Sequence, residues 1–173
     1  MKIIIKILLL TIILIFFPLK SFAHVEHYEK VEKFLMEIFK DGKKIGFNNY
    51  TFSRNDQNLE IDNKTEFNVS ILGLNAFSIK GASKEVYKNN KLVSFKSDTI
   101  QNKKKKFVDL YLDESKESYF IKGSSYTGTI DLDIVIGSWW NHKIIQTEKN
   151  ISPISGSINK QTINFIKKEK INL

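Results

Sequence analysis

A chain of 173 residues, 42% of them hydrophobic, is long enough to bury the core of one domain. The absence of cysteine excludes disulfide bonds, a thiol nucleophile and a cysteine metal site. The formal net charge of +8 includes three lysines and no acidic residue within the first 23 residues, so the rest of the chain carries an excess of only about 5 positive charges.

The first 23 residues follow the three-part plan of a cleavable secretory signal peptide. Two lysines precede an apolar run at residues 7–17, and the small-residue cleavage motif Ser21-Phe22-Ala23 follows. The run is shorter than the ~20 residues of a spanning helix, and Pro18 would interrupt its extension. We therefore expect cleavage after Ala23, a periplasmic or secreted protein, no nucleic-acid partner and no integral membrane span after cleavage. The alternative is an uncleaved N-terminal anchor.

A hairpin is expected at the start of the exported chain. Apolar residues alternate over residues 34–38, the tight-turn pair Asp41-Gly42 follows, and residues 45–52 form the returning strand. The alternation changes phase within the returning strand, because Ile45 and Phe47 have odd numbers whereas Tyr50 and Phe52 have even ones. We interpret this change as a β-bulge at Asn48-Asn49.

Further strands follow at short intervals. Residues 59–71 alternate most clearly, and Gly73 supplies a corner before a strand that runs to Tyr87. Turn residues then separate three more predicted strands, at residues 92–100, 107–112 and 119–122. Connections of two to six residues are typical of an antiparallel meander.

These elements predict a mainly β fold in one domain, residues 24–173, behind the signal peptide at residues 1–23. We expect a single strongly curved antiparallel meander, half-barrel or barrel-like. No long amphipathic helix is available to cover the sheet, although Val31 to Phe39 or Ile134 to Ile145 could form a short helix instead of a strand.

Several segments resemble a known family. They are Asp41-Gly42-Lys43-Lys44-Ile45-Gly46, Thr65-Glu66-Phe67-Asn68-Val69-Ser70-Ile71-Leu72-Gly73 and Ser138-Trp139-Trp140-Asn141. In these segments and their order, the chain resembles an uncharacterised family of secreted bacterial proteins, domain-of-unknown-function family 6134. The resemblance implies a periplasmic, curved β fold and brings no catalytic residues. Such proteins usually continue with further strands beyond the segment that matches residues 163–166, so the end at Leu173 predicts a shortened C-terminus with an open sheet edge.

The densest unusual cluster is Trp139, Trp140, Asn141 and His142. Adjacent tryptophans on a strand face opposite ways, so we expect one to fill the concave face of the sheet and the other to lie at its rim. The cluster is interpreted either as a plug that packs one end of the fold or as the mouth of a ligand site. In the second interpretation Trp140 is a platform and Asn141 a polar anchor.

Catalytic and metal chemistry receive little support. His142 with Asp131 or Asp133 could act as a base with its orienting carboxylate, but no serine in a nucleophile-elbow context accompanies them. His24 and His27 could bind a metal ion at a free N-terminus, but a solvated terminus is the favoured interpretation, because Glu26 is the only acidic ligand nearby in the sequence. We predict no catalytic residue, no metal site and no cofactor.

The sequence thus predicts a non-enzymatic periplasmic β-protein that holds a hydrophobic or amphipathic small molecule in its concave face, or packs against an envelope protein. The alternatives are a hydrolase acting on envelope material through Asp131, Asp133 and His142, and a module that binds partners by β-addition at an open edge. The lysine run at residues 103–106 is interpreted as a solvated turn, with contact to anionic lipid or envelope polymer as its alternative.

Overall fold

The computed structural model describes residues 30–164 and 166–167. The predicted signal peptide, His24 and His27 lie outside the described residues. Within the described part of the chain, no helix is long and apolar enough to cross a membrane.

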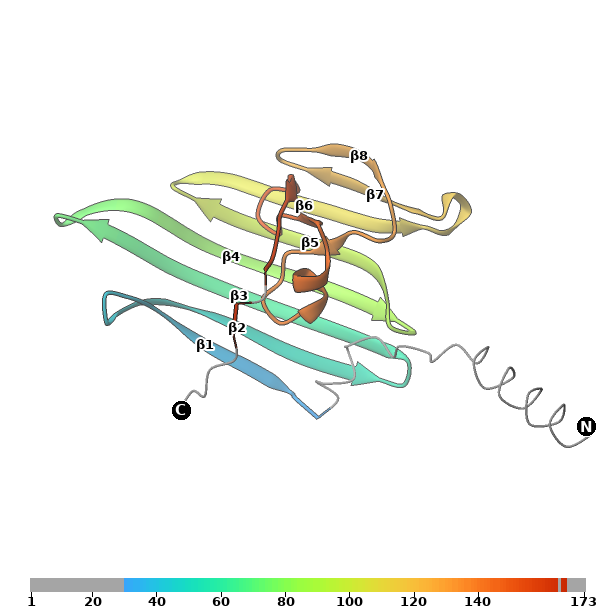
Figure 1. The fold of residues 1–173 in the computed structure, drawn as a ribbon, viewed down its shortest axis with the longest axis horizontal. Helices are drawn as coiled ribbons and strands as arrows, with labels where there is room; N and C mark the ends of the chain where they lie inside the picture. Colours follow the sequence, from blue (N-terminus) through green and yellow to red (C-terminus); the bar gives the residue numbers. More distant parts are fainter. Residues whose placement is uncertain (1–29, 165, 168–173) are drawn as a thin grey trace, which may run out of the picture.

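The main element is an eight-stranded antiparallel sheet (Figure 1). Each strand pairs with the next one in the sequence, as in the predicted meander. The sheet is open rather than barrel-like, because β1 and β8 are its two edges in the described residues. Its strands are β1 (Lys33–Lys40), β2 (Lys43–Asn55), β3 (Asn58–Ile71), β4 (Leu74–Lys88), β5 (Lys91–Gln101), β6 (Lys104–Asp113), β7 (Ser118–Gly123) and β8 (Thr127–Ile130).

A second layer of irregular chain covers part of one face of this sheet (Figure 1). We call residues 131–160 the C-terminal layer, the face beneath them the inner face, and the opposite face the outer face. The layer holds a three-stranded sheet in the order β11-β10-β9 and a 3-10 helix. Its elements are β9 (Val135–Ile136), η3 (His142–Gln146), β10 (Lys149–Ile151) and β11 (Ile158–Lys160), and a further 3-10 turn, η2 (Glu114–Lys116), links β6 to β7.

Neither segment for which a short helix was the alternative forms an α-helix in the described residues. Residues 33–40 are strand β1, and the second segment contains only the start of a 3-10 helix at residues 142–146. Strand β8 was not predicted at all, because its Gly128 and flanking hydroxyl residues suggested a turn.

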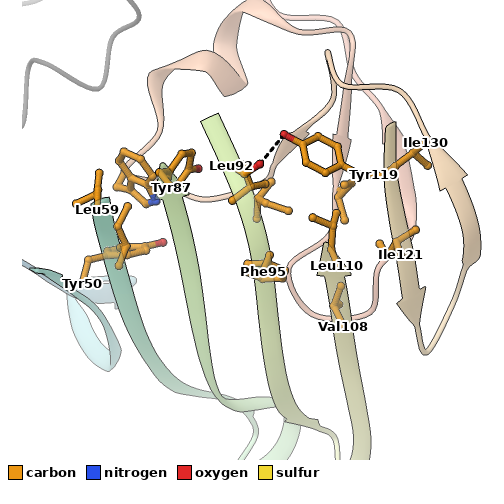
Figure 2. Packing of buried hydrophobic residues seen from close by; sticks show 14 of the residues in the cluster. Tyr50, Leu59, Tyr87, Leu92, Phe95, Val108, Leu110, Tyr119, Ile121 and Ile130 are labelled. Atoms are coloured by element: carbon orange, nitrogen blue, oxygen red, sulfur yellow. Dashed lines mark hydrogen bonds between the residues drawn. The ribbon is translucent and has the colours of Figure 1, made fainter. Parts of the chain in front are cut away.

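The hydrophobic core lies between the inner face and the C-terminal layer. Alternate residues of β2 to β8 point inward, and Figure 2 shows the cluster that they form above the strands. Phe95, Leu110 and Ile121 are fully buried there. Trp140, Ile136 and Ile151 of the layer complete the cluster. The layer therefore covers the apolar face of the sheet, a role for which the sequence offers no long amphipathic helix.

The predicted bulge at Asn48-Asn49 is wrong. Asn48 pairs with Thr65 in the regular register of β2 and β3, and the irregularity lies instead near Ile45, where β1 and β2 shift register. The apparent change of phase arises because Phe47 pairs with Glu66 on the outer face. An apolar side chain that points outward was therefore interpreted as a break in the strand.

Candidate functional site

The Trp139 to Asn141 segment packs the layer onto the inner face. Trp140 is 1% exposed, and its ring makes edge contacts with Phe52 at 5.7 Å and Tyr87 at 5.8 Å between centroids. Trp139 points the other way and is 67% exposed. The structure thus places Trp140 in the core, where its faces are already occupied by the protein itself.

A buried carboxylate that the sequence analysis did not single out lies next to Trp140. Glu85 is fully buried on β4, and its Oε1 accepts hydrogen bonds from Trp140 Nε1 at 3.0 Å and Ser138 Oγ at 2.5 Å. Its Oε2 accepts from the Tyr87 hydroxyl at 2.7 Å. Burial raises the pKa of Glu85 above its ordinary value, although the three donors act in the opposite direction.

Asn141 is also a structural residue. Its side chain is buried and accepts a hydrogen bond from the Lys143 backbone N–H at 3.0 Å, which caps η3. It also bonds the hydroxyl of Tyr87, whose pKa is raised well above its ordinary value mainly by burial. His142, the next residue, is exposed. Of the four predicted ligand residues, therefore, only Trp139 and His142 are open to solvent.

A second polar chain ties the layer to β2 and β3. The Trp139 backbone N–H donates to the Tyr50 hydroxyl at 3.2 Å, and the Asn48 side-chain amide donates to the same hydroxyl at 3.2 Å. Asn63 in turn donates to Asn48 Oδ1 at 2.6 Å. Burial raises the pKa of Tyr50, so this hydroxyl stays protonated at neutral pH.

Asp131 and Asp133 line a cleft of about 650 Å³ between β8 and the C-terminal layer. Glu148, Lys149 and Lys160 also border it, whereas His142 is not among its lining residues. Within the described residues, no group of three or more His, Asp or Glu side chains is arranged to hold a metal ion.

The outer face carries an open, mainly apolar trough across β2 to β6. It has a volume of about 580 Å³, and its floor is low because Ala82 stands between longer side chains on the neighbouring strands. Phe47 and Ile100 supply apolar walls, and Ile100 is 45% exposed. The full lining is Phe47, Lys64, Thr65, Glu66, Lys80, Gly81, Ala82, Asp98, Thr99, Ile100, Lys105 and Lys106.

A smaller hollow of about 350 Å³ continues the trough toward the β1–β2 turn. The two share Phe47, Glu66, Lys80 and Ile100, so they form one elongated surface feature. Lys80 pairs with Glu66 at 3.0 Å. Lys64 and Lys105 form no ion pair among the described residues, which leaves two cations available at the sides of an apolar floor.

The sequence profile of the family "Domain of unknown function (DUF6134)" matches residues 36–173. The chain belongs to this family. No curated protein and no solved structure matches it. The family resemblance inferred from the hairpin and double-tryptophan segments is therefore confirmed.

Two features of this DUF6134 protein could have been found in its sequence. Glu85 occupies an inward position of β4, two residues before Tyr87, where an apolar side chain is expected. Phe47 breaks the alternation of β2. Glu85 is thus a polar residue in the core, and Phe47 is an apolar residue on the outer face that lines the trough.

Proposed function

We propose that this protein is a non-enzymatic binding protein for a hydrophobic or amphipathic small molecule, and that the molecule lies in the outer-face trough. The observation that carries the proposal is the apolar lining formed by Phe47, Ala82 and Ile100. Ligand sites are typically concave, mostly apolar and lined by a few polar groups that fix orientation.

The trough has the size of a small-molecule site. Its volume of about 580 Å³ lies within the roughly 300–1,000 Å³ of small-molecule sites, and the adjoining hollow lengthens it. An extended molecule such as an acyl chain fits this elongated form. The inner face offers less room over the core, because Trp140 and the rest of the C-terminal layer fill it.

The charges at the trough favour an amphipathic anion. Four lysines and two acidic residues line it, and Lys80 is already paired with Glu66. Lys64 and Lys105 lie on β3 and β6, on either side of Ala82. A carboxylate or phosphate head group would interact with either lysine while its apolar chain covers Phe47 and Ile100.

The test is a titration of the purified, delipidated protein with cis-parinaric acid, a fluorescent fatty acid. We expect saturable binding that weakens at least about tenfold in Ala82→Ile, because the added carbons fill the floor of the trough. Thr51→Ile is the matched control, since Thr51 is exposed on β2 and does not line the trough. It should bind as the wild type does.

A charge variant tests the position of the head group. Lys64→Gln combined with Lys105→Gln should weaken binding and reduce its dependence on salt, because two screened attractions are removed. Absence of saturable binding by the wild type, or unchanged binding by Ala82→Ile, would refute the proposal.

We propose in addition that the protein acts in the periplasm or outside the cell, as the pattern of residues 1–23 predicts. The measurement is the intact mass of the protein recovered from each cell fraction. A mass that starts at His24, found outside the cytoplasm, is the expected result. An intact chain in the cytoplasm would contradict it.

A further inference from the structure

The β3–β4 hairpin projects beyond its neighbours. The pairing of β2 with β3 ends at Gly46 and Phe67, and that of β4 with β5 ends at Ile79 and Gln101. Residues 68–77 therefore lie outside the pairing with β2 and β5, and Figure 1 shows this hairpin as the furthest point at its end of the sheet. The projecting segment contains no charged residue.

The tip of this hairpin is apolar and exposed. Ile71 is 58% exposed, Leu72 98% and Leu74 75%. Phe67 and Phe77, on the two strands of the same hairpin, form a tilted ring pair with centroids 5.8 Å apart. Isolated exposed apolar residues are common, but a contiguous group at the end of a projecting hairpin indicates a binding surface.

Leu72 is also unfavourable for the turn that it occupies. Its φ is +51°, in the left-handed region, and Gly73 follows with φ +79°. This region suits Asn, Asp and Gly, whereas a leucine there is strained. At the other tight turns of the sheet the first left-handed residue is Asp41, Asp56, Asn89 or Asn102. Leu72 alone among these turn residues is apolar, and its side chain gains nothing from burial within the chain.

Positive charge flanks the apolar tip. The neighbouring β5–β6 turn carries Lys103, Lys104, Lys105 and Lys106, and the β1–β2 turn on the other side carries Lys40, Lys43 and Lys44. The β5–β6 turn is fixed to the hairpin by two hydrogen bonds between Asn102 and Ser78, of 3.0 and 2.7 Å. No acidic residue lies between residues 99 and 108. The second turn is less basic, because Lys40 pairs with Asp41 and Lys44 with Glu37.

We propose that this end of the sheet docks on a lipid bilayer that carries anionic headgroups. Leu72 and its apolar neighbours enter the interface, and the lysines of the β5–β6 turn contact the headgroups. Apolar insertion combined with a polybasic patch is the two-signal arrangement that gives stable peripheral binding. The strain at Leu72 is then explained, since its side chain is selected for the membrane rather than for the turn.

The experiment is co-sedimentation of the purified protein with vesicles of phosphatidylglycerol and phosphatidylcholine, compared with pure phosphatidylcholine. We expect binding at least about tenfold stronger to the anionic vesicles, weakened by added salt. Leu72→Asn should reduce binding about tenfold or more and raise the Tm by about 2–4 °C, because asparagine suits the left-handed turn. A loss of binding in a variant that is more stable excludes misfolding as the cause.

Two further variants separate the contributions. Lys103→Gln with Lys104→Gln should remove most of the preference for anionic vesicles, and neither residue lines the trough. Leu35→Asn, which changes another leucine that is 67% exposed, should bind vesicles as the wild type does. Ala82→Ile should also do so, which distinguishes surface docking from uptake of a single lipid by the trough.

Three results would overturn the proposal. The first is no binding to anionic vesicles, and the second is equal binding by the wild type and Leu72→Asn. The third is a lipid-free dimer that Leu72→Asn abolishes, because the tip would then be covered by a second copy of the chain.

Discussion

The indole Nε1 of Trp140 donates a hydrogen bond of 3.0 Å to Glu85 Oε1, across 55 residues of sequence. This bond joins the C-terminal layer to the middle of the sheet, and Ser138 and Tyr87 donate to the same carboxylate. A buried carboxylate with several donors is costly to disturb, because each donor loses a partner that water cannot replace. Because Trp140 and Ser138 of the layer both bond Glu85, attachment of the layer to the sheet depends on the protonation state of Glu85.

Glu85→Gln tests that sensitivity through pH. Burial raises the pKa of Glu85 above 4.5, its ordinary value, so the folded state retains the proton over a pH range where the unfolded chain has released it. The stability that Glu85 contributes is complete below the ordinary pKa and falls as pH rises through the raised one. Glutamine does not titrate, so the free energy of unfolding of the wild type relative to Glu85→Gln should decrease with rising pH.

Urea denaturation of both proteins between pH 4 and pH 8 measures this difference. Glu60→Gln is the control, because Glu60 pairs with Lys84 at 2.7 Å on the outer face of the same sheet, where both side chains are about half exposed. A difference between wild type and Glu85→Gln that stays constant or grows with pH would contradict the assigned direction.

The two adjacent tryptophans should differ greatly in their effect on stability. Trp140→Ala removes the edge contacts with Phe52 and Tyr87 and leaves Glu85 short of one donor. We expect it to lower the free energy of unfolding by about 3–5 kcal/mol. Trp139→Ala keeps the backbone N–H that bonds Tyr50, so its cost should stay below about 1 kcal/mol. Thermal unfolding followed by circular dichroism compares them, and similar losses would show that the assignment of the buried ring is wrong.

Much of the sheet was predictable because its signals are local. Residues 59–71 alternate between apolar and polar side chains over nearly the whole of β3, and the turns carry Asp, Asn or Gly at left-handed positions. Such patterns depend only on neighbours in the sequence. The number, order and direction of β1 to β7 follow from them, together with the preference for short connections.

The C-terminal layer was not predictable in the same way. Its strands β9, β10 and β11 have two or three residues each, too few for a periodic pattern. The layer is held by distant groups, such as the bond of 2.6 Å from Ser97 Oγ to the Pro153 carbonyl. The plug interpretation of the tryptophans predicted the kind of contact. Glu85 and Phe47 stand out in the sequence only as residues out of pattern, and the contacts that they make depend on distant strands.

Tyr119→Phe tests a bond at the irregular end of β5. The register shift between β4 and β5 pairs Val86 with Ser94 and Tyr87 with Leu92, and the Tyr119 hydroxyl donates to the Leu92 carbonyl at 3.1 Å (Figure 2). Loss of this hydroxyl should cost about 1 kcal/mol in the free energy of unfolding, because a buried carbonyl loses its partner.

The matched control is Tyr111→Phe, since Tyr111 is 50% exposed on the outer face. Its effect in the same urea denaturation should lie within about 0.5 kcal/mol of zero. Equal effects of the two substitutions would show that the Tyr119 hydroxyl makes no special contribution.

Gly46→Ala should be the most disruptive conservative substitution in the first hairpin. A Cβ at residue 46 would lie 2.1 Å from the Glu66 carbonyl oxygen and 2.4 Å from Phe67 Cβ, so β2 and β3 would have to move apart. We expect a loss of about 3 kcal/mol or more, at the upper end of the cost of overpacking, because backbone rather than a flexible side chain is displaced. Gly42→Asn is the control, since no atom lies within 4 Å of its Cβ position and asparagine tolerates the φ of +72°. It should cost less than about 1 kcal/mol, and a larger loss there than at Gly46 would show that the turn, rather than close approach of β2 to β3, limits this hairpin.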